Sequence, residues 1–293
     1  MHRTQPRRFI LSALLALILP ALAGCGEDAD KRVLLVVSNH GELGTTGQKT
    51  GVWMAELTHP YWKLADSGMD VTLDLASPDG GDAPIDAFSV RFNFDDFLAT
   101  GQHDSGDPGN TRFLESEATR RWVGTRNVTV TNGDGSTSEA VEYRFTHTLR
   151  LAEIDPADYD AIYFAGGNGA MWQLPGSEDV HQAVREFYES GKLVSAACHG
   201  TAALLNTKLS DGSYLVAGRR VTGFSNAEEH YLQQAGVMPL LLQDAFTERG
   251  ATYVEAEPWK ANVVVDGRII SGQNPPSAEG VGEKLVELLA SEP

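Results

Sequence analysis

Cys198 and His199 stand side by side where an apolar run, residues 192–198 (KLVSAAC), gives way to the helix-like segment GTAALLN. A nucleophile between a strand and a helix sits on a tight turn, and small neighbours let the backbone pass close to itself. Ala196 and Gly200 supply such neighbours, two residues to either side of the cysteine. The pattern predicts a nucleophilic thiol at the carboxyl end of a sheet, where open α/β folds bind ligands. The competing interpretation is a cysteine that fills a core gap beside a structural histidine.

Three further features could serve such a thiol. The helix after Cys198 is expected to direct its amino end at the sulfur, which lowers a thiol pKa from about 8.5 to roughly 3.5–7.5. Gly166 and Gly167 can turn their backbone N–H groups inward and are predicted to stabilise an oxyanion. Glu56 lies early on a predicted helix beside the apolar Trp53 and is the candidate acid that exchanges a proton with the thiol.

Alternating strand-like and helix-like segments must position these residues. Continuous apolar runs of the kind that central parallel strands need occur at 31–39, 69–77, 159–167 and 192–198. Helical spacing is found within 50–68, 178–191 and 277–290, and a hairpin is predicted within 261–272 around Asp266 and Gly267. This alternation predicts an α/β fold with a doubly wound, flavodoxin-like, mostly parallel sheet sandwiched by helices.

Residues 80–147 interrupt this pattern and are predicted to be an insertion. Residues 80–125 are rich in Asp, Gly and aromatic residues, and a connection that long is usually functional. We expect this part to form a cap, and 127–145 to form a projecting β-hairpin around a Gly-rich turn. The domain prediction is therefore a single domain over 32–293 that carries this insertion.

The first residues have the layout of an export signal. A basic start is followed by a short apolar run, and the segment closes with LAGC. This ending is similar to a bacterial lipobox, so residues 1–24 are predicted to be a lipoprotein-type signal peptide, Cys25 the lipidation site, and 25–31 a polar tether. The expected location is that of an exported bacterial lipoprotein on the periplasmic or cell-surface face of a membrane, held there only through the anchor. An ordinary cleaved signal with a free Cys25 is the alternative.

Composition narrows the classes of partner. The chain of 293 residues carries 40 Asp and Glu against 23 Lys and Arg, a net charge of −17. Such a surface argues against binding to nucleic acid. The chain has two cysteines, so acylation of Cys25 would leave Cys198 unpaired, and an unpaired thiol in an exported protein is exposed to oxidation.

Taken together, the segments SAACHG, FAGGNGAMWQLP, GVWMAELTHPYW, DYDAIYF and GRRVTGFSNAEE closely resemble the ThiJ/PfpI superfamily, which has the class I glutamine amidotransferase-like fold. Within it, they resemble the branch of glutathione-independent glyoxalases and stress chaperones. The likeness covers roughly residues 31–290. It implies dimerisation as one option, and neither a metal nor another cofactor.

The resemblance also implies roles for individual residues. Cys198 matches the nucleophile of the family, His199 the histidine directly after it, and Glu56 the acid that hydrogen-bonds the thiol. The acid that orients the histidine falls on Glu229, with Glu228 as the neighbouring alternative. Asn168 stands where the family has a histidine, so this position can still donate a hydrogen bond but cannot titrate.

The expected activity is a cysteine-dependent, glutathione-independent lyase that converts methylglyoxal or a related small 2-oxoaldehyde to a 2-hydroxy acid. The alternatives are a holdase-type chaperone and a redox-sensing thiol protein of the same fold. An amidotransferase or a peptidase fits less well, because true glutaminases of this fold place the histidine far downstream of the nucleophile.

Overall fold

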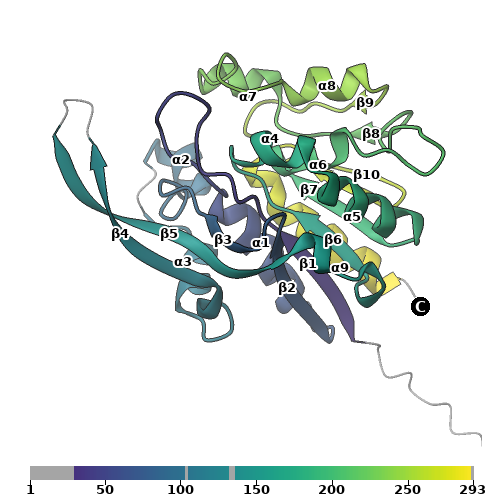
Figure 1. The fold of residues 1–293 in the computed structure, drawn as a ribbon, viewed down its shortest axis with the longest axis horizontal. Helices are drawn as coiled ribbons and strands as arrows, with labels where there is room; N and C mark the ends of the chain where they lie inside the picture. Colours follow the sequence, from purple (N-terminus) through teal and green to yellow (C-terminus); the bar gives the residue numbers. More distant parts are fainter. Residues whose placement is uncertain (1–29, 103–104, 132–135, 292–293) are drawn as a thin grey trace, which may run out of the picture.

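The computed structural model describes residues 30–102, 105–131 and 136–291. A mostly parallel sheet runs through the molecule in the order β10-β11-β7-β6-β1-β2-β5-β3, with β4 paired to β5 (Figure 1). Its strands are β1 (Lys31–Val36), β2 (Val71–Ser77), β3 (Gly81–Pro84), β4 (Val123–Thr131), β5 (Thr137–Arg150), β6 (Ala161–Phe164), β7 (Leu193–Ala197), β10 (Val263–Asp266) and β11 (Ile269–Gly272). A separate small ribbon joins β8 (Arg220–Val221) to β9 (Thr252–Tyr253).

The helices follow the strands as the sequence predicts for a doubly wound fold. The longest are α1 (Met54–Ala65), α5 (Glu178–Glu189) and α9 (Ala278–Ser291). The shorter ones are α2 (Phe94–Thr100), α3 (Pro108–Glu115), α4 (Ala170–Gln173), α6 (Ala202–Leu205), α7 (Asn226–Tyr231) and α8 (Leu242–Glu248). No helix among the described residues is both long and apolar enough to cross a membrane.

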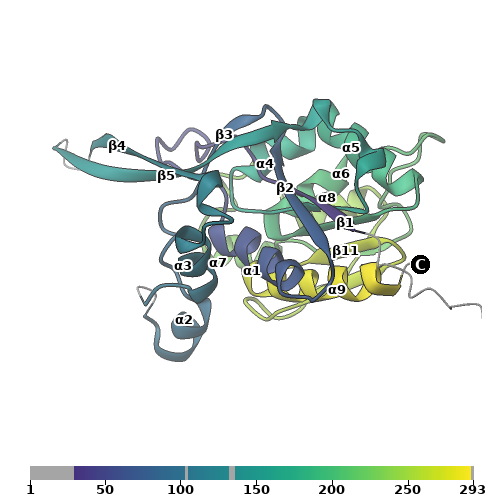
Figure 2. The ribbon, with the colours of Figure 1, turned by 90° about the horizontal axis from the view of Figure 1, so that it is seen from below.

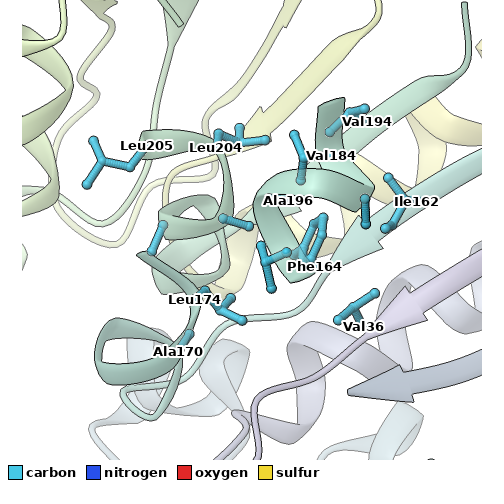
Figure 3. Close-up of a cluster of buried hydrophobic side chains, with 14 of the residues drawn as sticks. Val36, Ile162, Phe164, Ala170, Leu174, Val184, Val194, Ala196, Leu204 and Leu205 are labelled. Carbon is cyan, nitrogen blue, oxygen red and sulfur yellow. The ribbon is translucent and has the colours of Figure 1, made fainter. Parts of the chain in front are cut away.

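Both faces of the central strands are buried, which explains their continuous apolar sequences. Alternate residues of a strand point to opposite faces, and Leu34 and Val36 pack with α5 and α6 while Val33 and Leu35 pack with α1 and α9. Figure 2 shows α1 and α9 on one side of the sheet and α5 and α6 on the other. Figure 3 shows Phe164 among the side chains that join the sheet to the helices of the second side. The predicted fold class is confirmed.

The insertion is more continuous with the sheet than the sequence indicates. The predicted hairpin forms, but its strands are longer than 127–145, because β4 begins at Val123 and β5 runs to Arg150. β4 pairs antiparallel with β5 along its whole length, and the far end of β5 pairs parallel with β2 through Leu149 and Arg150. The hairpin projects from the body of the molecule (Figure 1), yet one of its strands also extends the main sheet. The predicted cap contains α2 and α3, and α3 packs on α1.

Two glycines let the ends of β6 and β7 meet without side chains between them. A Cβ on Gly200 would lie 2.3 Å from the carbonyl oxygen of Phe164, and one on Gly166 would lie 2.8 Å from the backbone nitrogen of Gly200. This contact brings the loop after β6 against the turn after β7, where Cys198 lies.

We expect Gly200→Ala to lower the free energy of unfolding by about 1–3 kcal/mol or more, because the new methyl group meets backbone that cannot rotate away. Denaturant titration of the variant measures this loss. Gly176→Ala is the matched control, since no atom of the described residues lies within 4 Å of its added Cβ. Equal stability of the two variants would contradict the close approach.

Candidate active site

Cys198 is the first residue of the 3₁₀ turn η5 (Cys198–Thr201), directly after β7. Its φ is 54°, a left-handed conformation that a non-glycine residue adopts only when the surroundings hold it. The Thr201 hydroxyl donates to the Cys198 carbonyl at 2.7 Å and ties down the turn. Only 3% of the cysteine is exposed, so its sulfur lies inside the protein and reaches substrate through a cavity.

Glu56 lies beneath this turn, on the first turn of α1, and is fully buried. Its Oε2 accepts the N–H of Gly166 at 3.0 Å, while Oε1 has no partner of standard geometry in the described chain. Burial raises the pKa of Glu56 to about 8. The Cys198 thiol and the Gly166 N–H act in the opposite direction, because they stabilise the carboxylate, but burial has the larger effect. The pKa of Glu56 is therefore close to neutral pH, where a carboxyl group can both accept and donate a proton during catalysis.

The thiol and the carboxyl group share one environment. Burial, and next the negative charge of Glu56, raise the pKa of Cys198 well above its usual value. The expectation that the amino end of the following helix lowers the thiol pKa is therefore wrong, because desolvation and a neighbouring acid outweigh two short helical turns, η5 and α6. The backbone N–H of His199 acts in the opposite direction and stabilises the thiolate. Since ionisation of either group opposes ionisation of the other, Glu56 and Cys198 titrate as a pair.

His199 also contacts the sulfur. Its Nδ1 lies 3.6 Å from Sγ of Cys198, and its Nε2 lies 2.7 Å from Oε1 of Glu229. Both His199 and Glu229 are 2% exposed. A carboxylate at Nε2 accepts the proton of that nitrogen, which leaves Nδ1 to accept a proton from the thiol.

The adjacent Glu228 faces elsewhere. Its carboxylate accepts from the N–H and hydroxyl of Ser225, in a capping box that begins α7, and from the side chain of Asn274 at 2.8 Å. Neighbouring residues on a helix point about 100° apart, so only Glu229 reaches His199. Of the two acids that the sequence leaves open, the structure brings Glu229 to the histidine.

We expect Glu229→Gln to lower kcat/KM about 10-fold to 1000-fold, because an amide at Nε2 no longer fixes the tautomer or stabilises the imidazolium. Steady-state kinetics measure this. Glu228→Gln tests a different group, since its carboxylate does not touch His199. A variant Glu229→Gln with wild-type kcat/KM would remove His199 from proton transfer.

Of the two glycines predicted to supply oxyanion donors, only Gly167 has a free N–H among the described residues. Sequence reasoning predicts oxyanion donors at Gly166 and Gly167, but the Gly166 N–H is taken by Glu56, so that prediction is wrong for Gly166. Within the described chain, the N–H of Gly167 has no hydrogen-bond partner, and this residue has a φ of 99°. Gly167 and Asn168 line the same cavity as Cys198. The Asn168 side chain is half-buried and has no hydrogen-bond partner in the described residues.

The cavity over the sulfur has a volume of about 440 Å³ and is lined mainly by apolar and aromatic side chains. Its lining includes Cys198, His199, Glu56, Gly167, Asn168, Trp53, Phe88, Phe92, Phe94, Phe97, Phe224, Tyr231 and Trp259. Sequence analysis missed Phe224 and Trp259 because they lie on loops far along the chain from the elbow. The close spacing of Phe88, Phe92, Phe94 and Phe97 in the predicted cap was the sequence feature that could have indicated an aromatic cavity wall.

A second hollow, of about 740 Å³, adjoins this cavity but contains none of the predicted site residues. It lies against the β4–β5 hairpin and is lined by charged side chains that include Lys49, Arg126, Glu142 and Arg144. Arg126 pairs with Glu142, and Arg144 with Asp82. Because these charges pair with one another and no nucleophile is present, the smaller cavity is the candidate active site.

No group of three or more metal-ligating side chains occurs among the described residues. His59 interacts with both carboxylate oxygens of Asp107, and His40 stacks on Trp172. Cys25 and the signal segment lie outside the described residues, so the lipidation prediction is untested by the structure.

The fold and the site define a class of α/β proteins with a buried cysteine on a strained strand-to-helix turn, flanked by a glutamate and a histidine. The chain belongs to the DJ-1/PfpI family, whose model matches residues 115–288.

Three relatives illustrate the likeness. The chain is 29% identical over 264 residues to glyoxalase 3 of Candida albicans, covering 87% of this chain and 97% of that protein. The solved structure of glyoxalase III from Candida albicans has a TM-score of 0.65 at 26% identity, covering 88% of this chain and 96% of that one. The structure of the rapid encystment protein of Francisella tularensis has a TM-score of 0.73 at 32% identity, covering 88% of this chain and 99% of that one.

Proposed function

We propose that this protein is a glutathione-independent glyoxalase that converts methylglyoxal or a related 2-oxoaldehyde to the 2-hydroxy acid. The observation that carries the proposal is the position of the Cys198 sulfur between two groups that can transfer protons, Glu56 and His199, in one aromatic-lined cavity. The names of the relatives support it, because the matched proteins from Candida albicans are glyoxalases.

The first step is addition of the Cys198 sulfur to the aldehyde carbon, C1. The thiol proton passes to Glu56 or His199 as the C–S bond forms. The C1 oxygen becomes negative, is stabilised by the N–H groups of Gly167 and His199, and is then protonated to give a hemithioacetal.

The second step moves hydrogen between carbons without an external oxidant. Glu56 or His199 removes the C1 proton, the electron pair of that bond forms a C1–C2 double bond, and the C2 carbonyl oxygen takes up a proton, so an enediol forms. A proton is then returned to C2 and the C1 hydroxyl loses its proton, which gives a thioester at C1 and a hydroxyl at C2, so C1 is oxidised as C2 is reduced. General acid–base transfer of this kind typically contributes about 10²–10⁴-fold to the rate.

The last step is hydrolysis. Water attacks the thioester carbonyl, the C–S bond breaks, and the sulfur leaves as thiolate and regains its proton from the flanking acid. The sum is one 2-oxoaldehyde plus one water to one 2-hydroxy acid. Every acid, base and hydrogen-bond donor named in these steps belongs to the chain itself.

The test is to incubate the protein with methylglyoxal in the absence of glutathione and added metal, and to measure lactate. In deuterated water we expect deuterium at C2 of the lactate, because the proton taken from C1 exchanges with solvent at the flanking base. Absence of lactate would overturn the proposal.

We also propose that the protein is an exported lipoprotein held by a lipid on Cys25, a proposal supported by the basic, apolar and LAGC segments of the sequence alone. The expected result is an intact mass of the mature protein that starts at Cys25 and carries acyl chains. Cys25→Ala should abolish that modification and leave the glyoxalase activity of the folded domain unchanged. A mass without lipid would contradict the anchor. Homodimerisation stays a prediction from the family resemblance.

A further inference from the structure

The cavity is far larger than methylglyoxal requires. Methylglyoxal has five non-hydrogen atoms, and at one water volume of about 30 Å³ for each it occupies at most about 150 Å³. The cavity measures about 440 Å³. Bound methylglyoxal would leave most of this space to water in contact with aromatic rings, which is unfavourable.

The unfilled space is bordered by a connected series of aromatic rings, which begins at the catalytic histidine. Phe224 lies 4.4 Å from the ring of His199, Trp259 lies 5.8 Å from Phe224, and Phe94 lies 5.9 Å from Trp259. Phe94 is in turn 6.0 Å from Trp53, which directly precedes α1 and hence Glu56. All of these residues line the same cavity as the sulfur. The rings therefore form a continuous series from His199 to the start of α1.

Trp259 is held in this series against its conformational preference. Its φ is 64°, which is an outlier for a bulky side chain. The buried carboxylate of Glu228 accepts the backbone N–H of Trp259 at 2.9 Å and is itself fixed by Ser225 and Asn274. Strain of this kind persists where the surrounding structure imposes it, and it concentrates at ligand sites. Glu228, which does not orient His199, is thus a positioning residue for the aromatic wall.

From this arrangement we infer that the site prefers 2-oxoaldehydes with an aromatic or comparably large apolar substituent, and that Trp259 determines this preference. The inference rests on the proposed glyoxalase function and specifies its substrate class. A phenyl group in place of the methyl group raises the upper bound on ligand volume to about 300 Å³ for ten non-hydrogen atoms, which the cavity accommodates. Ring-on-ring contact with Trp259 and Phe94 would then replace water.

The test compares phenylglyoxal with methylglyoxal in wild type, Trp259→Gly and Trp259→Phe. Glycine tolerates the φ of residue 259, so Trp259→Gly removes the ring without adding strain. We expect wild-type kcat/KM to be at least about 10-fold higher for phenylglyoxal. Trp259→Gly should lower the value for phenylglyoxal about 10-fold to 100-fold and the value for methylglyoxal less than about 3-fold, and Trp259→Phe should retain most of the preference. Trp62→Ala, outside the cavity, should leave both values unchanged.

Equal losses for both aldehydes in Trp259→Gly, or a wild-type preference for methylglyoxal, would overturn the inference. A readout without turnover separates it from the proposed function. In Cys198→Ala, calorimetry should show mandelate binding at least about 10-fold more tightly than lactate, and Trp259→Gly in that background should remove the difference. If neither aldehyde is turned over, the glyoxalase proposal fails, and the mandelate comparison alone decides whether the aromatic subsite exists.

Discussion

Cys198→Ala should abolish lactate formation, with kcat lowered about 10⁴-fold or more, because removal of the nucleophile leaves only binding and the remaining acid–base groups. Without the sulfur, neither the hemithioacetal nor the thioester can form. The measurement is the rate of lactate production from methylglyoxal by wild type and variant at equal concentration. Retained activity in Cys198→Ala would refute covalent catalysis.

Cys198→Ser is the companion variant because it preserves the shape of the turn. An alcohol ionises much less readily than a thiol, and the environment here already disfavours the anion. We expect this variant to be as inactive as Cys198→Ala. Both variants should remain folded, since neither adds volume and each keeps a side chain that the position already accepts. Melting temperatures near that of wild type establish that the lost activity is chemical.

Glu56→Gln should have the second largest effect on activity, about a 10²–10⁴-fold loss of kcat. Glutamine can still accept the Gly166 N–H through its oxygen, but its amide cannot exchange a proton with the thiol. In wild type, the reactive form of the pair has lost one of its two protons. With the pKa of Glu56 raised to about 8, kcat/KM should increase as the pH rises toward 8 and then level off. This rise should be absent from the residual activity of Glu56→Gln.

The same substitution should stabilise the protein at alkaline pH. The carboxyl group of Glu56 keeps its proton up to about pH 8 in the folded chain, whereas its ordinary value is 4.5. Between pH 4.5 and pH 8 the folded state binds more protons than the unfolded state. The protonated Glu56 therefore stabilises the folded state fully below about pH 4.5, and this stabilisation is lost as the pH rises through 8. Each unit of displacement corresponds to about 1.4 kcal/mol, so we expect several kcal/mol over this range.

The comparison that isolates this effect is the melting temperature of wild type and Glu56→Gln from pH 5 to pH 9. The difference should be small at pH 5 and should grow in favour of the variant with rising pH. Glu257→Gln is the control, because residue 257 is exposed and its side chain has no hydrogen bond or ion pair among the described residues. The melting temperature of this variant should run parallel to that of wild type from pH 5 to pH 9. A pH-independent difference for Glu56→Gln would mean that residue 56 is charged throughout.

Local patterns allowed much of this site to be predicted from the sequence. The apolar run before Cys198, the small residues around it and the acid on the first helix are features of short segments, and the fold class follows from the alternation of strands and helices. Glu229 could not be separated from Glu228 in the same way. Which of two adjacent acids faces the histidine depends on the rotation of α7. The capping box between Ser225 and Glu228 is local, but Asn274 and the Trp259 backbone, which hold the Glu228 carboxylate away from His199, lie far along the chain.

What the sequence could not provide depends on distance and burial. The sequence alone indicates that the Gly166 N–H is available to stabilise an oxyanion. In the fold, this N–H donates instead to the Glu56 carboxylate, 3.0 Å away. The thiol pKa was expected to fall because the helix end is visible in the sequence, whereas full burial of a neighbouring acid is not. Likewise, the β4–β5 hairpin has a recognisable turn, but the pairing of its last residues with β2 depends on where β2 ends.

The left-handed backbone at residue 198 also limits how this enzyme could be diversified. A library that samples all amino acids at this position would recover few folded members with β-branched side chains, because Val, Ile and Thr disfavour a φ of 54° most strongly. Asparagine, aspartate and glycine tolerate that geometry but offer no sulfur-like reactivity. New chemistries would therefore be sought more profitably at the rings around the cavity than at the nucleophile, where backbone shape and reactivity have to be satisfied by the same side chain.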